Sequence, residues 1–193
     1  MSRAARVLFS LLLPTVLVSC QQNSKQGHSY FDSLVIAQVA HLSKAKASIV
    51  KKTMLQGKAE QSTFVPDSSA WEYELGIFRQ LSAFERPAYR LSYSVEDGIR
   101  DGASNLRIRR YQATEKIPVP ELRFYYFNEF KNLKKIEAIY QQQNWLYATT
   151  RRLSLEFDDI EGESILTSYR IEGAQKMVLG DSVRISIRSE ITN

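Results

Sequence analysis

After Pro87 the apolar residues of this chain change from helical spacing to alternation, and this change constrains the fold more than any other feature. From Tyr89 to Glu96, apolar side chains alternate with polar ones, and comparable runs recur towards the C-terminus. A period of two is typical of strands with one buried and one polar face. Short turn sequences such as Asp97-Gly98 separate the runs, so sequential strands are expected to pair antiparallel. The pattern predicts a meander of roughly seven or eight strands.

The predicted strand at residues 106–113 requires a β-bulge. Leu106, Ile108 and Tyr111 share one face only if a bulge near Arg109-Arg110 shifts the alternation. The segments expected to form strands are 89–96, 106–113, 122–127, 136–140, 145–158, 165–171, 176–179 and 183–191.

Two segments before Pro87 have the spacing of amphipathic helices. Between Tyr30 and Ala45, apolar residues recur every three or four positions. A second helix is predicted from Ser69 to about Phe84, because Ser69 and Glu72 fit a capping box. Between the helices, segments 50–55 and 58–64 are expected to form a hairpin around Gln56-Gly57.

These elements predict an α+β fold in which two N-terminal helices pack on a curved antiparallel meander sheet or open barrel. A sheet with one apolar face needs a cover, and the amphipathic helices can supply it. In outline this arrangement is similar to the half-barrel of the lipoprotein carriers LolA and LolB. In those carriers a curved sheet and helices enclose an apolar cavity. The similarity is one of topology.

The chain begins with an export signal that ends at its single cysteine. Arg3 and Arg6 precede an apolar segment, 7–18, that is too short to span a bilayer. The run Leu17-Val18-Ser19-Cys20 closely resembles the lipobox of bacterial lipoproteins. The resemblance implies that residues 1–19 are removed, that Cys20 is lipidated and that polar residues 20–29 form a tether. The alternative is an ordinary secretory signal with a cysteine nearby.

The residues after Cys20 bear on location. In the enterobacterial pattern an Asp after the lipidated cysteine retains the protein in the inner membrane, whereas this chain has Gln21. Surface lipoproteins of Bacteroidota tend to carry acids there, and 21–29 has none. The body of the chain resembles small envelope lipoproteins of Bacteroidota, to which no activity is attached. By resemblance, a lipid-anchored protein of the outer membrane facing the periplasm is expected.

Removing the leader leaves 174 residues, of which 30–193 suit one globular domain. The remaining 24 basic and 21 acidic residues leave only a small positive excess, which is no footprint of nucleic-acid binding. With Cys20 lipidated, no thiol remains for a disulfide, a redox pair or a thiolate metal site. Stability must therefore come from burial of apolar side chains.

Motifs of known chemistry are missing from the sequence. His28 and His41 lack the spacing and the cysteine partners of a zinc site, and there is no nucleophile elbow or phosphate-binding glycine loop. No cofactor and no metal are therefore expected. The acidic run from Asp158 to Glu163 offers oxygen ligands for calcium, but an exposed hairpin turn explains it as well.

Aromatic residues are the best candidates for a binding site, although none is a candidate for catalysis. Trp71 and Phe78 lie on one face of the second predicted helix, where they either form core or line a ligand cavity. Aromatic side chains also gather in neighbouring strands, where exposed members would mark a partner or lipid surface. The candidates from those strands are Phe124, Tyr126, Tyr140 and Trp145.

A second candidate is a band of arginines. Such a band on successive strands could lie beside anionic lipid headgroups, or it could be a solvated face paired with Glu137, Glu156 and Glu172. Its members are Arg107, Arg109, Arg110, Arg123, Arg151 and Arg152.

Two functions follow from these observations. The first is a membrane-anchored envelope lipoprotein, attached through Cys20, that acts as a non-enzymatic binding module for a lipid-like or protein partner. The second is an envelope hydrolase whose site is assembled from dispersed residues, such as a pair of carboxylates. A large apolar pocket would favour binding, and a cleft with strongly perturbed carboxylates would favour catalysis.

Overall fold

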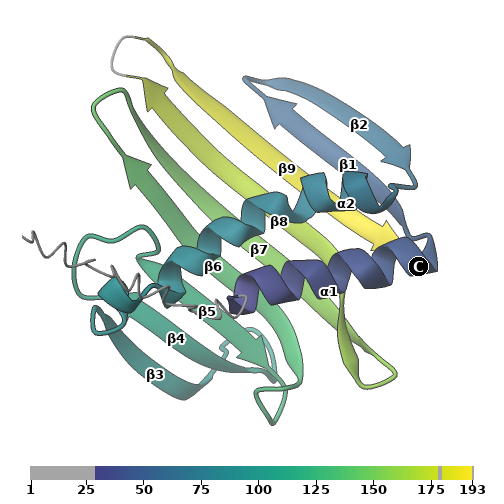
Figure 1. Cartoon of the computed structure of the whole chain (residues 1–193), viewed down its shortest axis with the longest axis horizontal. Coiled ribbons are helices and arrows are strands. Elements are labelled where there is room, and N and C mark those ends of the chain that lie inside the picture. The colour runs from purple at the N-terminus through teal and green to yellow at the C-terminus, as the bar shows by residue number, and fades with distance from the viewer. Residues whose placement is uncertain (1–28, 178–179, 193) are drawn as a thin grey trace, which may run out of the picture.

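In the computed structural model, nine strands form one antiparallel sheet and two helical segments cross it (Figure 1). The structure describes residues 29–177 and 180–192, so the leader, Cys20 and the predicted tether up to residue 28 lie outside the described residues. The helical elements are α1 (Tyr30–Ala45), α2 (Ser68–Leu75), and the 3₁₀ segments η1 (Gly76–Glu85) and η2 (Pro87–Tyr89). The strands are β1 (Ser48–Leu55), β2 (Lys58–Phe64), β3 (Tyr93–Arg100), β4 (Arg107–Ala113), β5 (Glu121–Tyr126), β6 (Leu133–Gln143), β7 (Tyr147–Ile160), β8 (Glu163–Met177) and β9 (Ser182–Thr192).

The order of strands across the sheet confirms the predicted α+β class and the antiparallel meander. From β3 to β9 each strand pairs with the next along the chain, in the order β2-β1-β9-β8-β7-β6-β5-β4-β3. The sheet is open, with β2 and β3 at its edges. Both helical segments come from the first half of the chain, but the β1–β2 hairpin separates them. They are therefore not a consecutive N-terminal pair.

One pairing joins the two ends of the domain. Strand β1 pairs with β9 over eight residue pairs, from Ser48 with Thr192 to Leu55 with Ile185. The N-terminal hairpin thus extends the meander beyond its last strand, and this makes a single sheet of nine strands.

The core lies between the sheet and the helices, which cover the same face (Figure 1). Phe31 and Leu42 of α1 are fully buried against inward-facing residues of the central strands, such as Ile136 and Leu153. Among the described residues, the buried cluster runs from Phe31 of α1 to Ile191 of β9. The other face of the sheet, hereafter the open face, is covered by no helix or strand among the described residues.

Four local details differ from the sequence predictions. Helix α2 begins after Asp67, whose carboxylate accepts the Ala70 N–H, so the predicted Ser69–Glu72 capping box is wrong. The helix continues as a 3₁₀ segment from Gly76. Strand β3 starts at Tyr93 because η2 occupies the preceding residues. The expected bulge lies in β3, between Glu96 and Ile99, where Gly98 adopts positive φ.

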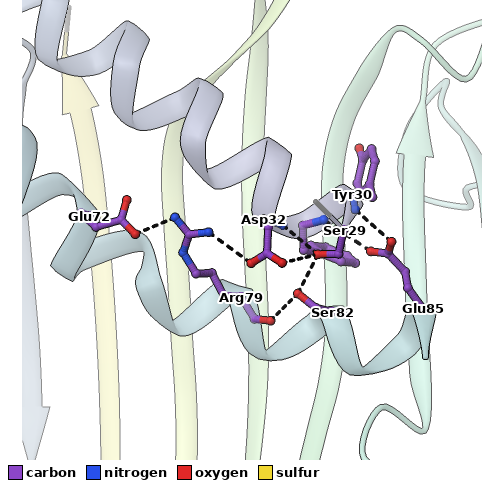
Figure 2. A network of polar contacts seen from close by, with 8 residues as sticks. Ser29, Tyr30, Asp32, Glu72, Arg79, Ser82 and Glu85 are labelled. Carbon is purple, nitrogen blue, oxygen red and sulfur yellow. Dashed lines mark hydrogen bonds and ion pairs between the residues drawn. The ribbon is translucent and has the colours of Figure 1, made fainter. Parts of the chain in front are cut away.

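A polar network fixes the first described residues to η1 (Figure 2). Ser29 caps α1 by accepting the Asp32 N–H, and its hydroxyl lies 2.9 Å from that of Ser82. Glu85 accepts the Tyr30 N–H at 2.9 Å. Arg79 bridges Asp32 and Glu72. These contacts therefore join the N-terminal end of α1 to α2 and η1.

A second polar cluster ties α2 to the sheet. Glu74 accepts from Lys51 Nζ of β1 at 2.7 Å and from the Tyr169 hydroxyl of β8 at 2.6 Å. Burial first, and then the hydrogen bond to Glu74, raise the pKa of Tyr169 above its usual range. These contacts hold α2 over the β1 side of the sheet.

Candidate binding site on the open face of the sheet

The two aromatic candidates of the second helical segment belong to the core. Trp71 and Phe78 are both 0% exposed, and the Phe78 ring packs edge-on against Tyr169 with 5.7 Å between centroids. The structure therefore places both side chains between the helices and the sheet, as the core interpretation predicts.

The four aromatic candidates from the strands lie in different parts of the fold and differ in their exposure. Phe124 and Tyr126 are buried in a cluster at the start of α1, where Phe124 stacks near Phe31 and meets Phe130. Tyr140 is half-buried beside the core on β6. Trp145 is 82% exposed in the turn between β6 and β7. The structure does not bring the six candidates together, and none of them lines the clefts described below.

Tyr126 takes part in a polar contact at this end of the sheet. Its hydroxyl donates to Asp97, which also pairs with Arg109. The hydrogen bond from Arg109, followed by that from Tyr126, lowers the pKa of Asp97 to about 2. Arg109 lies over the Phe130 ring at 4.1 Å. The group fixes the bulged edge strand β3 to its neighbours.

Alternation splits the predicted arginine band between the two faces. Arg109 and Arg151 point to the helix-covered face, where Arg151 donates to Gln80 of η1 at 2.8 Å. The neighbouring Gly173 leaves space for Arg151, since a Cβ there would lie 3.1 Å from its Cγ. Arg110, Arg123 and Arg152 lie on the open face. The band is therefore not continuous.

A different set of basic side chains does line up on the open face. Residues directly opposite one another in a sheet point to the same side, so the strand registers define rows. Ser154 of β7 is opposite Arg170 of β8, which is opposite Arg188 of β9, which is opposite Lys52 of β1. These positions alternate with buried residues such as Leu153 and so belong to the open face. Three cations thus occupy adjacent strands.

Two further arginines extend this row into a patch. Arg152 lies two residues from Ser154 on β7, and Arg184 lies four residues from Arg188 on β9, so both share the open face. We call the set Lys52, Arg152, Arg170, Arg184 and Arg188 the cationic patch. All five are exposed.

Few acids within the protein neutralise the cationic patch. Among the described residues only Arg188 of the five has an ion pair, with Glu172 at 3.8 Å. Of the other acids nearby, Glu156 and Glu190 lie in the next row, and Glu137 lies opposite Ser154 on β6, where it is paired with Lys135. Glu156 lies within 3.8 Å of Lys135 and accepts from Ser168. The patch therefore has a net positive charge that faces solvent.

The open face is hollowed where short side chains stand among long ones. A cleft of about 340 Å³ includes Ser154 and Ser168 between Lys52, Arg170 and Arg188, and Glu156 and Glu190 line its other end. A second cleft of about 460 Å³ shares Lys52 and Arg188 and reaches the β2 edge. Both are open to solvent, so the basic side chains are accessible to an anion.

Another cleft on this face, of about 230 Å³, contains two carboxylates. Glu121 and Glu137 line it with Arg123 and Arg152. Burial alone would raise the pKa of Glu137, but hydrogen bonds from Lys135 and Tyr125 outweigh it and lower the pKa below the usual range. Glu121 is paired with Arg123. Both carboxylates are therefore already paired with cations of the protein.

The acidic run near residue 160 forms the turn between β7 and β8. Asp159 accepts the Gly162 N–H at 2.9 Å, and Glu161 and Gly162 both adopt positive φ. In the part of the chain that the structure describes, no three His, Cys, Asp or Glu side chains come together as ligands for a metal ion.

Sequence reasoning missed four members of the cationic patch, Lys52, Arg170, Arg184 and Arg188. Their alignment depends on the register of β8 with β9 and on the pairing of β1 with β9, which joins segments at opposite ends of the domain. The only available signal was the recurrence of basic residues at alternating positions in each strand, and that does not give the strand order.

Comparisons with known proteins add no assignment. No protein-family model matches the chain, and searches of curated proteins and of solved structures return no match. Of the helices within residues 29–177 and 180–192, none has the length and apolar character needed to cross a membrane.

Proposed function

We propose that this chain is a bacterial envelope lipoprotein, anchored through Cys20, whose domain is a non-enzymatic binding module for a lipid-like or protein partner. In this proposal the sheet curves around the helices, and its open face is the binding surface. The protein is held at the outer membrane and faces the periplasm.

The observation that carries the proposal is the row of Arg170, Arg188 and Lys52 on the open face, which no helix or other strand within residues 29–177 and 180–192 covers. Like charges directly opposite one another in a sheet destabilise it. A fold that accepts this arrangement with no acid directly opposite Arg170, Arg188 or Lys52 is suited to an external partner. The burial of Trp71 and Phe78 supports binding outside the sheet over binding in an interior apolar cavity.

The proposed lipid anchor is supported by the sequence of residues 1–20. The lipobox-like run that ends at Cys20 supports lipidation, and several lipid chains make membrane attachment stable. The absence of acids after Cys20 supports the periplasmic side.

The hydrolase alternative has less support. A general acid that works near neutral pH needs a raised pKa, whereas the pKa of Glu137 in the carboxylate cleft is lowered. Its carboxylate is also occupied by Lys135 and Tyr125. The geometry therefore favours binding over proton transfer at this cleft.

Photo-cross-linking in bacteria that make the full chain tests the binding surface. A benzophenone amino acid replaces Ala174, an exposed open-face residue outside the patch, and the matched control replaces Tyr73, which is 85% exposed on α2. We expect a defined adduct from position 174 and none from position 73. Equal adducts at both positions, or none at 174, would show that the open face is not the binding surface.

A further inference from the structure

We infer that the cationic patch binds the phosphate groups of anionic lipid headgroups at a membrane surface. This inference rests on the proposed function, and it names the class of ligand for the same face. It differs from the arginine band expected from the sequence, because five of that band's six members are not in the patch.

The charge balance of the patch requires an anion. Within the rows that contain the five cations on β7, β8, β9 and β1, the only acid is Glu172, which is paired with Arg188. The net charge of these rows is therefore +4. The acids Glu156 and Glu190 border these rows along the strands, and Glu137 of β6, which is paired with Lys135, borders them across the sheet.

The spacing of the cations suits several phosphates better than one. Strands β7 to β1 are four neighbours, so Arg152 and Lys52 stand about 14 Å apart across the sheet at roughly 4.8 Å per strand. Arg184 and Arg188 are about 13 Å apart along β9. A single phosphate cannot meet all five side chains. A surface that carries many phosphates can.

The chemistry of the side chains agrees with this ligand. Four of the five cations are arginines, whose planar guanidinium groups donate two parallel hydrogen bonds to phosphate oxygens. Serines 154 and 186 lie in the same rows and are short, so headgroups can approach the strands between the arginines. Open clefts rather than an enclosed cavity fit a surface ligand.

The predicted tether is long enough for this contact. Ser29 begins α1 on the helix-covered side, and residues 20–29 span up to about 30 Å when extended. The helical layer is about 10–12 Å thick. A lipid on Cys20 can therefore enter the same bilayer on which the open face rests.

Vesicle sedimentation tests the inference with residues 21–193, which retain every contact that the structure describes. The probes are vesicles of about one part phosphatidylglycerol to three of phosphatidylcholine, and vesicles of phosphatidylcholine alone. Binding is expected only to the anionic vesicles and should weaken as salt is raised. The variant R170Q/R188Q is expected to bind roughly 10- to 30-fold more weakly, the effect of losing two basic residues at an anionic surface.

The matched control is R86Q/R90Q, which removes two exposed arginines flanking η2. It should bind like the parent. A second test variant, K52Q/R184Q, serves if R170Q/R188Q does not fold, which circular dichroism would show. Equal losses in the test and control variants, or no binding to anionic vesicles, would overturn the inference.

Two further outcomes separate this inference from the proposed function. Competition by inorganic phosphate at low concentration would indicate a soluble phosphate ligand and overturn the lipid assignment. A protein adduct at position 174 without vesicle binding would also overturn it, while the open face remained a binding surface. If neither an adduct nor vesicle binding is found, both proposals fail.

Discussion

Replacing Trp71 with alanine tests how the helices hold the sheet. The Trp71 side chain is 0% exposed and is the largest fully buried side chain of the core. Truncating a buried Trp or Phe to Ala removes its transfer free energy and leaves a cavity, together worth about 3–5 kcal/mol. Because small domains are stable by only about 5–15 kcal/mol, we expect Trp71→Ala to lose a large fraction of the free energy of unfolding.

Trp71→Phe is the matched control. The indole Nε1 of Trp71 is buried and has no hydrogen-bond acceptor among the described residues. An unpaired buried donor costs about 1–3 kcal/mol, and phenylalanine removes that donor while keeping most of the apolar volume. The loss in Trp71→Phe should therefore be smaller than about 2 kcal/mol, because the two effects oppose each other.

Urea unfolding of residues 21–193, followed by circular dichroism, measures both changes, and binding of an apolar dye is measured in parallel. Suppose that Trp71→Ala lowers the free energy of unfolding by less than about 1 kcal/mol, and that the parent binds the dye whereas the variant does not. Trp71 would then line a wet cavity instead of the core. That result would refute the reasoning and favour an interior ligand.

Three other predictions follow from the leader, the ion pairs and the composition. Cys20→Ala in the full chain should abolish incorporation of labelled fatty acid and lipoprotein-type cleavage; mass spectrometry of an unacylated native N-terminus would contradict this. Because the pKa of Asp97 is lowered in the folded state, its ion pair stabilises the protein above pH 4 and this contribution disappears as the pH falls towards 2. Asp97→Asn should therefore cost about 0.2–1 kcal/mol at pH 7, as expected for an exposed pair, and less at pH 2.5; an equal cost at both pH values would rule out the electrostatic explanation. Neither reductant nor chelator should change the melting temperature of residues 21–193, and a fall of several degrees with chelator would point to the Asp159 turn as a metal site.

Local patterns predicted the elements well where local contacts decide them. The β1–β2 hairpin matches its prediction closely because Gln56 and Gly57 both adopt positive φ in a tight turn. The alternation of Leu153 and Leu155 correctly gave the buried face of β7. The end of α2 was less predictable, because the change to 3₁₀ geometry at Gly76 has no strong sequence signal.

The candidate site was less predictable, because it is formed across strands. Alternation shows that Arg151 and Arg152 point to opposite faces, yet only burial of a neighbour shows which face is open. Arg170 and Arg188 become opposite residues through the register of β8 and β9. Lys52 joins them through a pairing that spans almost the whole domain.

The pairing of β1 with β9 also sets the order in which the domain can fold. Closing a loop of this length has an entropic cost, and contacts between distant segments slow folding. The β1–β2 hairpin can pair with the rest of the sheet only when β9 has been synthesised. Synthesis must therefore be nearly complete before β1 can pair with β9.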